Sequence, residues 1–301
     1  MTIADHRHHH NPDNQSNKRI ISTIILKLFI CVVEIIGGLL SGSLSLLADA
    51  MHNFTDGVAV LISFLARKIG RRSPDEKMTF GYRRAEILAA LLNSSVIIAI
   101  SLSLFKEAYF RFRSPQEILV PSMLVVGVFG FLADLLSVYL LHPEARQDMN
   151  MRAAYLHLLG DALSSIGIII AGIIIYFSNF YIIDPILTVA IALFILTQGY
   201  QILRQSTLIL MERVPAHLNT EDIQKKVETI PEISSLHHVH IWQIDEDKFL
   251  FEGHITLNRD MKVSEADEIR KKVEEILSGD FNIHHPHLQL EFSYCNNQKC
   301  E

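Results

Sequence analysis

The sequence predicts a polytopic α-helical membrane protein with six transmembrane helices and a C-terminal α/β ferredoxin-like (αββαβ) cytoplasmic domain. Three observations support this fold class. The mean hydropathy is positive, and 49% of the residues are hydrophobic. These residues form long runs up to about Arg213, beyond which the sequence is charged and ordinary in composition. Six of the runs reach the ~20 residues that a helix needs to cross the hydrocarbon core.

The six predicted spans are residues 20–40, 44–66, 85–105, 118–141, 153–177 and 182–203. Most of them are too long to be buried helices of a soluble protein. The second and fifth spans are the least apolar, because both contain His and Asp. We therefore divide the chain into a disordered, His-containing tail (1–17), a transmembrane domain (18–212) and a cytoplasmic domain (213–301).

The distribution of Lys and Arg predicts that both termini are cytoplasmic. Seven basic residues fall between spans two and three, whereas the connections 41–43 and 178–181 carry no charge. Only Arg111 and Arg113 go against this trend. Residues 1–17 lack the apolar segment of a cleavable signal peptide, so the first span is expected to direct insertion into the cell (inner) membrane.

Composition excludes several functional classes. The three cysteines, Cys31, Cys295 and Cys300, cannot form a disulfide framework for the membrane part. There is no basic stripe interleaved with aromatic residues, so we expect no nucleic-acid partner. The sequence also contains no nucleotide-binding motif, and we expect no organic cofactor.

The segment after Arg213 begins with a predicted helix and two strands. Thr220 is the expected N-cap of the helix, and Pro231 follows the end of that helix. Residues 235–244 and 249–257 have strand-like patterns and are joined by a charged turn.

A second helix and a last strand complete the predicted domain. Ser264 is the expected N-cap of the helix, and Gly279 is expected to end it. Residues 284–292 are the last strand, in which His285, His287, Gln289 and Glu291 share one face. The order αββαβ is a ferredoxin-like arrangement without its first strand, and so small a domain gains stability by dimerising.

Two identical pairs of ionisable residues stand inside predicted spans: His52 with Asp56, and His157 with Asp161. A charge at bilayer depth costs at least ~2.5 kcal/mol, so such residues usually face the protein interior and serve a function. The i, i+4 spacing places each His and its Asp on one helix face. Two such faces turned toward each other form a tetrahedral cage for Zn²⁺ or a similar ion. A metal site at the centre of a membrane protein predicts transport.

Other interpretations of these intramembrane residues stay open. Single His or Asp residues can hold helices together through hydrogen bonds, although two identical pairs make this explanation weaker. Asp49 either orients an imidazole of the site or caps polar backbone near the membrane surface. Asp134, in span four, has a proton, a metal ion or Asn93 as its candidate partner.

The chain resembles the cation diffusion facilitator family of proton-coupled metal exporters over nearly its whole length. Four groups of residues carry the resemblance. They are Glu34-Ile-Ile-Gly37-Gly38 with Gly42-Ser43 and Asp49 to Asp56; Thr79-Phe-Gly-Tyr-Arg-Arg-Ala-Glu86 with Asn93; Arg152-Ala-Ala-Tyr-Leu-His157 with Asp161 to Ser165; and His237-His-Val-His-Ile-Trp242 with His285-Pro-His287-Leu-Gln289. At the position of Asp134 the family usually has an amide.

The resemblance implies a homodimer in the lipid bilayer that exchanges cytoplasmic Zn²⁺ for H⁺. Members with His-Asp on both helices resemble the zinc-preferring branch, and Cd²⁺ and Co²⁺ also fit the site. A proton and Zn²⁺ compete for a neutral imidazole, and imidazole side chains ordinarily titrate near pH ~6.5. We therefore expect Zn²⁺ capture on the cytoplasmic side and its displacement by protons on the other side.

The resemblance also implies a second metal site in the cytoplasmic domain. His237, His254, His285 and His287 correspond in position to metal ligands of the family. Zn²⁺ bound there would tighten the dimer and act as a regulatory ligand. The alternative is that these are solvated strand histidines.

Two rival functions and two weaker features remain. A membrane metal sensor would bind the ion without moving it. An intramembrane metalloenzyme would need an open coordination position and usually a His-Glu-x-x-His motif, which the sequence lacks. The tract His6 to His10 either ferries metal or is a solvated tail, and the spacing of Cys295 and Cys300 is longer than that of a usual metal pair.

Overall fold

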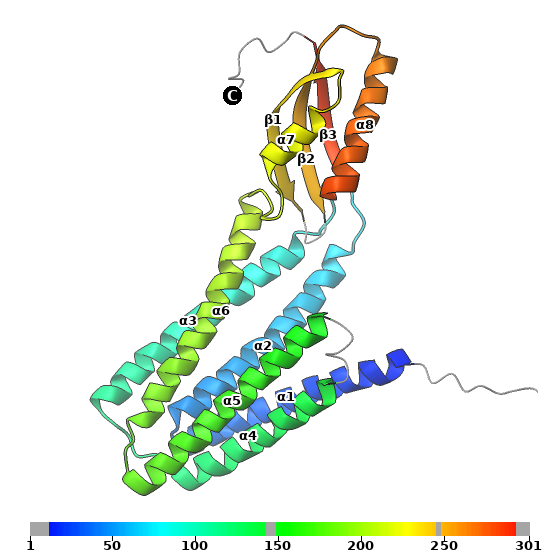
Figure 1. Cartoon of the computed structure of the whole chain (residues 1–301). Helices are drawn as coiled ribbons and strands as arrows, with labels where there is room; N and C mark the ends of the chain where they lie inside the picture. The colour runs from blue at the N-terminus through cyan, green and yellow to red at the C-terminus, as the bar shows by residue number, and fades with distance from the viewer. Residues whose placement is uncertain (1–11, 143–148, 245–247, 293–301) are drawn as a thin grey trace, which may run out of the picture. The chain divides into compact units, whose positions relative to one another are not determined.

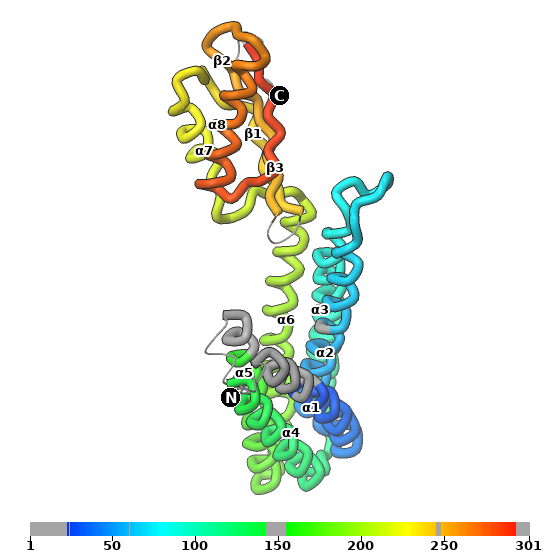
Figure 2. Tube along the Cα trace, turned by 90° about the vertical axis from the view of Figure 1, so that its right-hand side faces the viewer, coloured from blue at the N-terminus to red at the C-terminus, as the bar shows by residue number. Residues whose placement is uncertain are grey.

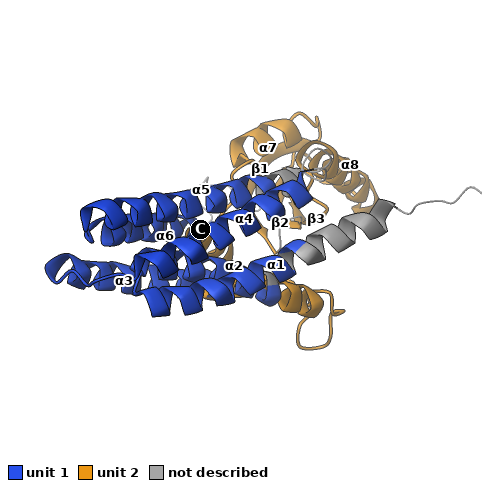
Figure 3. Cartoon of the chain, turned by 90° about the horizontal axis from the view of Figure 1, so that it is seen from below, with its two compact units in different colours: residues 1–62, 93–201 blue, residues 63–92, 202–301 orange. Residues whose placement is uncertain are grey.

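The structure is a computed structural model that describes residues 12–142, 149–244 and 248–292. The histidines of the N-terminal tail and the pair Cys295 and Cys300 lie outside these residues. Two compact units make up the chain and are described separately (Figure 3). The first unit comprises residues 1–62 and 93–201, and the second comprises residues 63–92 and 202–301.

Six long helices correspond to the six predicted spans (Figure 1). They are α1 (Pro12–Ser41), α2 (Leu44–Gly70), α3 (Ala85–Arg113), α4 (Val120–Leu141), α5 (Met149–Ser178) and α6 (Ile183–Leu210). Within the described residues, α3, α4, α6 and the part of α5 from Tyr155 are long and apolar enough to cross a membrane. Helix α2 carries four charged residues, Asp49, Asp56, Arg67 and Lys68. The chain is thus a membrane protein with several spanning helices.

In the first unit, α4 packs against both α1 and α5 (Figure 2). Small residues allow these helices to approach closely. A Cβ atom at Gly37 of α1 would lie only 2.5 Å from Cγ2 of Val126 in α4, and one at Gly172 of α5 would lie 2.7 Å from Cδ2 of Leu124. Larger residues at either position would push the helices apart.

Helix α2 contributes to two buried apolar clusters of the first unit. Leu46 packs with Met123 of α4 and Ile168 of α5. Leu44 and Ala48 belong to a second cluster, with residues of α3 and α6. Contacts on both sides therefore fix the rotation of α2 about its axis, which decides where its polar residues point.

The second unit contains the small α/β fold. Its elements are α7 (Thr220–Val227), β1 (Ile233–Gln243), β2 (Phe249–Leu257), α8 (Val263–Phe281) and β3 (His285–Glu291), in the predicted order αββαβ (Figure 1). The sheet order is β1-β2-β3, with β1 antiparallel and β3 parallel to β2. A parallel pair needs a long crossover connection, and α8 supplies it. The core contains Phe251 and Ile255 of β2 with Val273 and Leu277 of α8.

The helix ends of this fold differ from the prediction. Asn219, and not Thr220, is the N-cap of α7, because its side chain accepts a hydrogen bond from the Glu221 amide at 3.0 Å. Ser264 is not an N-cap either, since the N-cap of α8 is Lys262, two residues earlier, and the helix begins at Val263. Gly279 lies inside α8.

The terminating residue of α8 is Asn282. Its φ of 58° is left-handed, a conformation that Asn adopts more readily than most other residues. The chain therefore leaves the helix at Asn282, three residues after Gly279, where the helix was predicted to end.

Candidate metal centre

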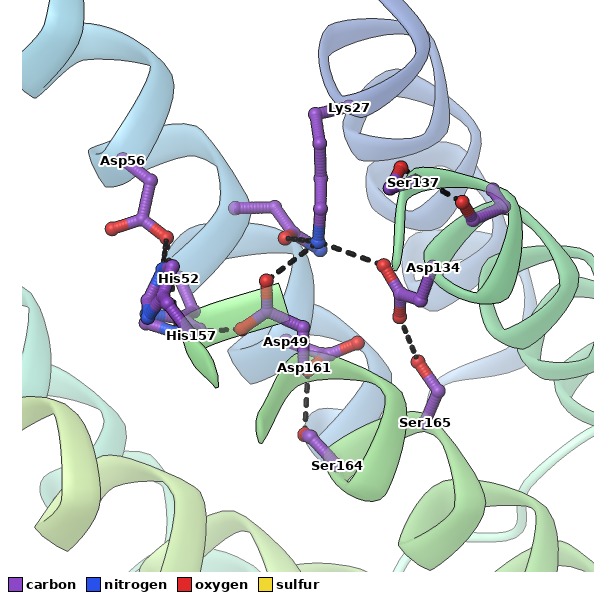
Figure 4. A network of polar contacts seen from close by, with 12 residues as sticks. Lys27, Asp49, His52, Asp56, Asp134, Ser137, His157, Asp161, Ser164 and Ser165 are labelled. Carbon is purple, nitrogen blue, oxygen red and sulfur yellow. Dashed lines mark hydrogen bonds and ion pairs between the residues drawn. The ribbon is translucent and has the colours of Figure 1, made fainter. Parts of the chain in front are cut away.

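The two His-Asp pairs meet in the first unit. His52 and Asp56 lie one turn apart on α2, and His157 and Asp161 lie one turn apart on α5 (Figure 4). Nε2 of His157 is 2.8 Å from Oδ2 of Asp56, and Nε2 of His52 is 3.3 Å from Oδ1 of Asp161. Each imidazole therefore faces the carboxylate of the other helix.

The distances between these groups match those around a tetrahedral metal ion. Zinc bonds of ~2.1 Å give an edge of ~3.4 Å between neighbouring ligand atoms. The separations of 2.8 and 3.3 Å, with 3.8 Å between Nε2 of His52 and Oδ2 of Asp56, lie on both sides of this value. Ligand atoms of His52, His157 and Asp161 all lie within 4.8 Å of one another. Asp56 is not part of this group of three, but its Oδ2 lies 2.8 Å from Nε2 of His157 and 3.8 Å from Nε2 of His52.

Burial divides the four groups into two deep and two accessible ones. The side chains of His52 and Asp161 are 5% and 2% exposed, whereas those of His157 and Asp56 are 34% and 37% exposed. Both ring nitrogens of His52 and Oδ1 of Asp161 are buried without an aligned hydrogen-bond partner among the described residues. Such groups each cost ~1–3 kcal/mol if left unsatisfied, so the site is suited to a ligand that satisfies them.

Lys27 is a part of the site that the sequence analysis missed. Its Nζ lies 2.6 Å from Oδ2 of Asp161, 2.7 Å from Oδ1 of Asp134 and 3.1 Å from Oδ1 of Asn53 (Figure 4). Asp134 also accepts a hydrogen bond from Ser165 at 2.8 Å. The structure thus gives Asp134 a partner that was not among its three candidates. The signal was present, because a Lys inside an apolar run is rare unless it is paired.

Two further carboxylates next to the site hold helices together. Asp49 accepts a hydrogen bond of 2.6 Å from Ser164 of α5. Glu34 of α1, 1% exposed, accepts one of 2.9 Å from the side-chain amide of Asn53 in α2. These bonds tie α1 and α5 to α2 close to its metal-site residues. The described hydrogen bond of Asp49 leads to α5, and no described bond joins it to an imidazole.

The start of α2 is fixed by Asp184 of α6, which is fully buried. The Asp184 carboxylate accepts hydrogen bonds from the Leu44 and Ser45 amides at 2.8 and 3.1 Å. It also accepts from the Ser43 and Ser45 hydroxyls at 2.8 and 2.6 Å. A carboxylate at a helix N-terminus satisfies its free amides and is favoured by the helix dipole. This contact anchors α2 two turns before His52.

A second cluster of metal-ligand residues lies in the α/β fold. His237 of β1 pairs in register with His254 of β2. Glu291 of β3 reaches both, with Oε1 3.0 Å from Nε2 of His237 and Oε2 3.8 Å from Nδ1 of His254. Ligand atoms of the three residues lie within 4.8 Å of one another.

His285 and His287 lie outside this group of three. They pair in register with Leu250 and Glu252, at the opposite end of β3 from Glu291. Glu291 was on the predicted strand face, but the sequence analysis did not count it as a ligand. The alternation along β3 could have suggested it, because residues two apart share a face.

Comparisons with known proteins find similar proteins for nearly the whole chain. Residues 20–211 match the family described as "Cation efflux transmembrane domain", and residues 197–293 match "Cation efflux protein, cytoplasmic domain". The zinc transporter ZitB of Pectobacterium atrosepticum is 38% identical over 98% of this chain and 91% of its own length. A "Cadmium, cobalt and zinc/H(+)-K(+) antiporter" of Bacillus velezensis is 35% identical over 94% of this chain and 91% of its own. ZitB of Escherichia coli is 34% identical over 98% and 94%.

Proposed function

The chain belongs to the cation diffusion facilitator family of cation efflux proteins, and from this premise we propose that it is a proton-coupled antiporter that exports Zn²⁺ from the cytoplasm. It is a membrane transporter and not an enzyme. The observation that supports the proposal most strongly is the meeting of two imidazoles and two carboxylates from α2 and α5.

This set of side chains suits Zn²⁺ as the transported ion. His52, Asp56, His157 and Asp161 together carry a charge of about −2 when both imidazoles are neutral, so a divalent ion makes the shell nearly neutral. The short separations favour four-coordinate ions over Mg²⁺ or Mn²⁺, which prefer six oxygen-rich ligands. Cd²⁺ and Co²⁺ are further candidate cargoes, in keeping with the name of the Bacillus velezensis relative.

All six long helices span the membrane in this proposal. The charged residues Lys27 and Glu34 of α1 and Asp49 of α2 have polar partners in the protein, so they need not face lipid. The basic residues between α2 and α3 favour cytoplasmic termini in the inner membrane. The proposed domains are the tail 1–17, the membrane domain 18–212 and the ferredoxin-like domain 213–301.

The exposure pattern supports a site that is open toward the cytoplasm. In the proposed orientation α2 runs toward the cytoplasm and α5 runs away from it. Asp56 follows His52 by one turn, and His157 precedes Asp161 by one turn, so the two accessible ligands are the ones nearer the cytoplasm. Toward the other side, the buried contacts of Asp184 hold α2 and α6 together.

Coupling to protons follows from the chemistry of the ligands. Zn²⁺ binds the neutral imidazole, so each bound ion excludes protons from two histidines, and protons in turn displace the ion. In the inward-facing state the site captures cytoplasmic Zn²⁺. In the outward-facing state protons bind His52 and His157, release Zn²⁺ and return inward with the empty carrier.

The cytoplasmic domain is proposed to dimerise and to sense Zn²⁺. His237, His254 and Glu291 are the ligands that the geometry supports, and His285 and His287 are the additional candidates from the sequence. An ion at this cluster would join β1, β2 and β3 and stabilise the dimer. Cytoplasmic Zn²⁺ would in this way favour its own export.

Transport in proteoliposomes tests the proposal. An imposed pH gradient should drive Zn²⁺ uptake into vesicles that contain the protein, and Asp161→Ala should abolish it. Glu117→Ala, at an exposed carboxylate between α3 and α4, is the matched control and should keep the wild-type rate. A Zn²⁺ flux that is the same with and without the pH gradient would refute proton coupling. Zn²⁺ binding without any flux would identify a sensor instead.

A further inference from the structure

Lys27 binds one of the proposed metal ligands directly. Its ammonium has three N–H donors, and the structure gives it three acceptors: Asp161, Asp134 and Asn53. Both carboxylates are almost fully buried, at 2% and 1% exposed, and the Lys27 side chain is 16% exposed. A lysine with all its donors used in this way is held in one position.

The contact gives the two oxygens of Asp161 different environments. Oδ2 accepts the hydrogen bond from Lys27 at 2.6 Å. Oδ1 points to Nε2 of His52 at 3.3 Å and is buried without an aligned donor among the described residues. A metal ion held by His52 and His157 therefore meets Oδ1, while Oδ2 is already in use (Figure 4).

The number of oxygens that Asp161 offers matters for the choice of ion. Four-coordinate Zn²⁺ takes one oxygen from each carboxylate. Ions that prefer six or more oxygen-rich ligands, such as Mn²⁺, gain from a carboxylate that binds through both oxygens. Lys27 removes this second oxygen from the site.

The structure also shows how the chain tolerates a lysine at this position. Asp134 carries a charge opposite to that of Lys27, and Ser165 holds its other oxygen. The pair Lys27 and Asp134 therefore adds no net charge to the site. The four ligands keep the charge that matches one divalent ion.

We propose that Lys27 is a positioning residue that restricts Asp161 to one ligand oxygen and thereby favours Zn²⁺ over Mn²⁺ at the transport site. The inference rests on the proposed function, because it concerns the same four ligands. It assigns a role in ion selectivity to Lys27, whose charge Asp134 balances.

The test compares Zn²⁺ and Mn²⁺ affinities of the full-length protein in detergent. His237→Ala and His254→Ala are present in every sample, so that titration calorimetry with ZnCl₂ or MnCl₂ reports the membrane site. Lys27→Met combined with Asp134→Asn removes the contact without changing the net charge. The ratio of the Mn²⁺ to the Zn²⁺ dissociation constant should fall roughly tenfold, the usual size of effects from groups that hold a ligand. Asp134→Asn alone keeps Lys27 on Asp161 and should leave the ratio within about twofold of the wild type.

Two results would overturn the role of Lys27. One is a double variant that binds Zn²⁺ and keeps the wild-type ratio. The other is a full change of the ratio in Asp134→Asn alone. If the double variant does not fold, the number of Zn²⁺ ligands is measured instead, by X-ray absorption of the Zn²⁺-loaded protein with an intact Lys27. Four nitrogen and oxygen ligands at ~2.0–2.1 Å support the inference, and five or six ligands contradict it.

A separate variant distinguishes this inference from the proposed function. His157→Ala should strongly weaken Zn²⁺ binding in the same background. If it does not, the transport site itself is wrong and the inference falls with it. If His157→Ala abolishes binding but the ratio is unchanged in the double variant, only the role of Lys27 is refuted.

Discussion

Replacing Glu291 with Gln should weaken Zn²⁺ binding at the cytoplasmic cluster more than replacing His285 and His287 together. Glu291 lies 3.0 Å from His237 and 3.8 Å from His254, and its side chain is 6% exposed. The two downstream histidines pair in register with Leu250 and Glu252, outside this group. The comparison therefore separates the ligands that the geometry supports from those that the sequence suggested.

The expected size follows from the charge that the substitution removes. A divalent ion and a carboxylate oxygen ~2.1 Å apart attract each other by ~4 kcal/mol even at the dielectric constant of bulk water. The Gln amide oxygen and water recover part of this energy. We expect a net loss of about 1.4–2.8 kcal/mol, which corresponds to a dissociation constant raised about 10- to 100-fold.

The assay is calorimetric Zn²⁺ titration of the full-length protein carrying Asp161→Ala, which removes a ligand of the proposed membrane site. Glu291→Gln is compared with the double variant His285→Ala, His287→Ala in this background. A large loss in the histidine variant with little change in Glu291→Gln would refute the ligand set derived from the β2–β3 register. Equal small effects would mean that the cluster does not bind Zn²⁺ at all.

Three further predictions concern the membrane site, the start of α2 and the loop after it. His52→Asp should broaden selectivity and raise Mn²⁺ flux relative to Zn²⁺ flux in proteoliposomes, because a carboxylate, which suits Mn²⁺, replaces an imidazole, which suits Zn²⁺. Asp184→Ala should lower the thermal midpoint in detergent, because two buried amides lose their acceptor at a cost of about 2–6 kcal/mol in total. In the loop, the Tyr82 hydroxyl donates to Asp75 at 2.6 Å, which lowers the pKa of the Asp75 carboxyl and raises that of the Tyr82 phenol. The hydrogen bonds that Asp75 accepts are thus complete above the ordinary pKa of a carboxyl and are lost as the pH falls through the lowered pKa. The protection of the Lys77 amide, which is its exchange rate relative to the intrinsic rate at the same pH, should therefore fall only in strongly acidic buffer.

Each of these predictions has its own comparison. An unchanged Mn²⁺ to Zn²⁺ flux ratio in His52→Asp would mean that the imidazole does not set selectivity. Asp184→Asn should lose less stability than the Ala variant, because its amide oxygen still accepts, and equal midpoints for all three proteins would contradict the capping role. Asp75→Asn should make exchange of the Lys77 amide fast at neutral pH.

The two His-Asp pairs could be singled out from the sequence because their signal is local. His52 with Asp56 and His157 with Asp161 each lie one turn apart, so helix geometry alone places each pair on one face. Ionisable residues in an apolar run also have few explanations. The order of elements in the C-terminal part was predicted for a similar reason, since alternation and turn residues act over a few positions.

The residues that were missed depend on contacts between distant segments. Lys27 pairs with Asp134 and Asp161, which are more than a hundred residues away in the sequence. The residues around Lys27 in its own span do not indicate which carboxylates pair with it. Glu291 reaches His254 because of the register between β2 and β3. The N-cap of α7 lies one residue before the predicted one and the end of α8 lies three residues after the predicted one, because several polar residues near a helix end compete for the same role.

By itself, the sequence determined that this protein has long apolar helices, a small α/β fold and two identically spaced His-Asp pairs within its apolar segments. These properties come from hydrophobicity and from spacing along one element, which the chain carries wherever it folds. Only the tertiary structure decided which helix faces meet, that Lys27 holds Asp161 and Asp134, and that Glu291 joins the cytoplasmic histidines. Those contacts depend on how packing rotates each helix and sets the register of each strand, and both are properties of the whole fold.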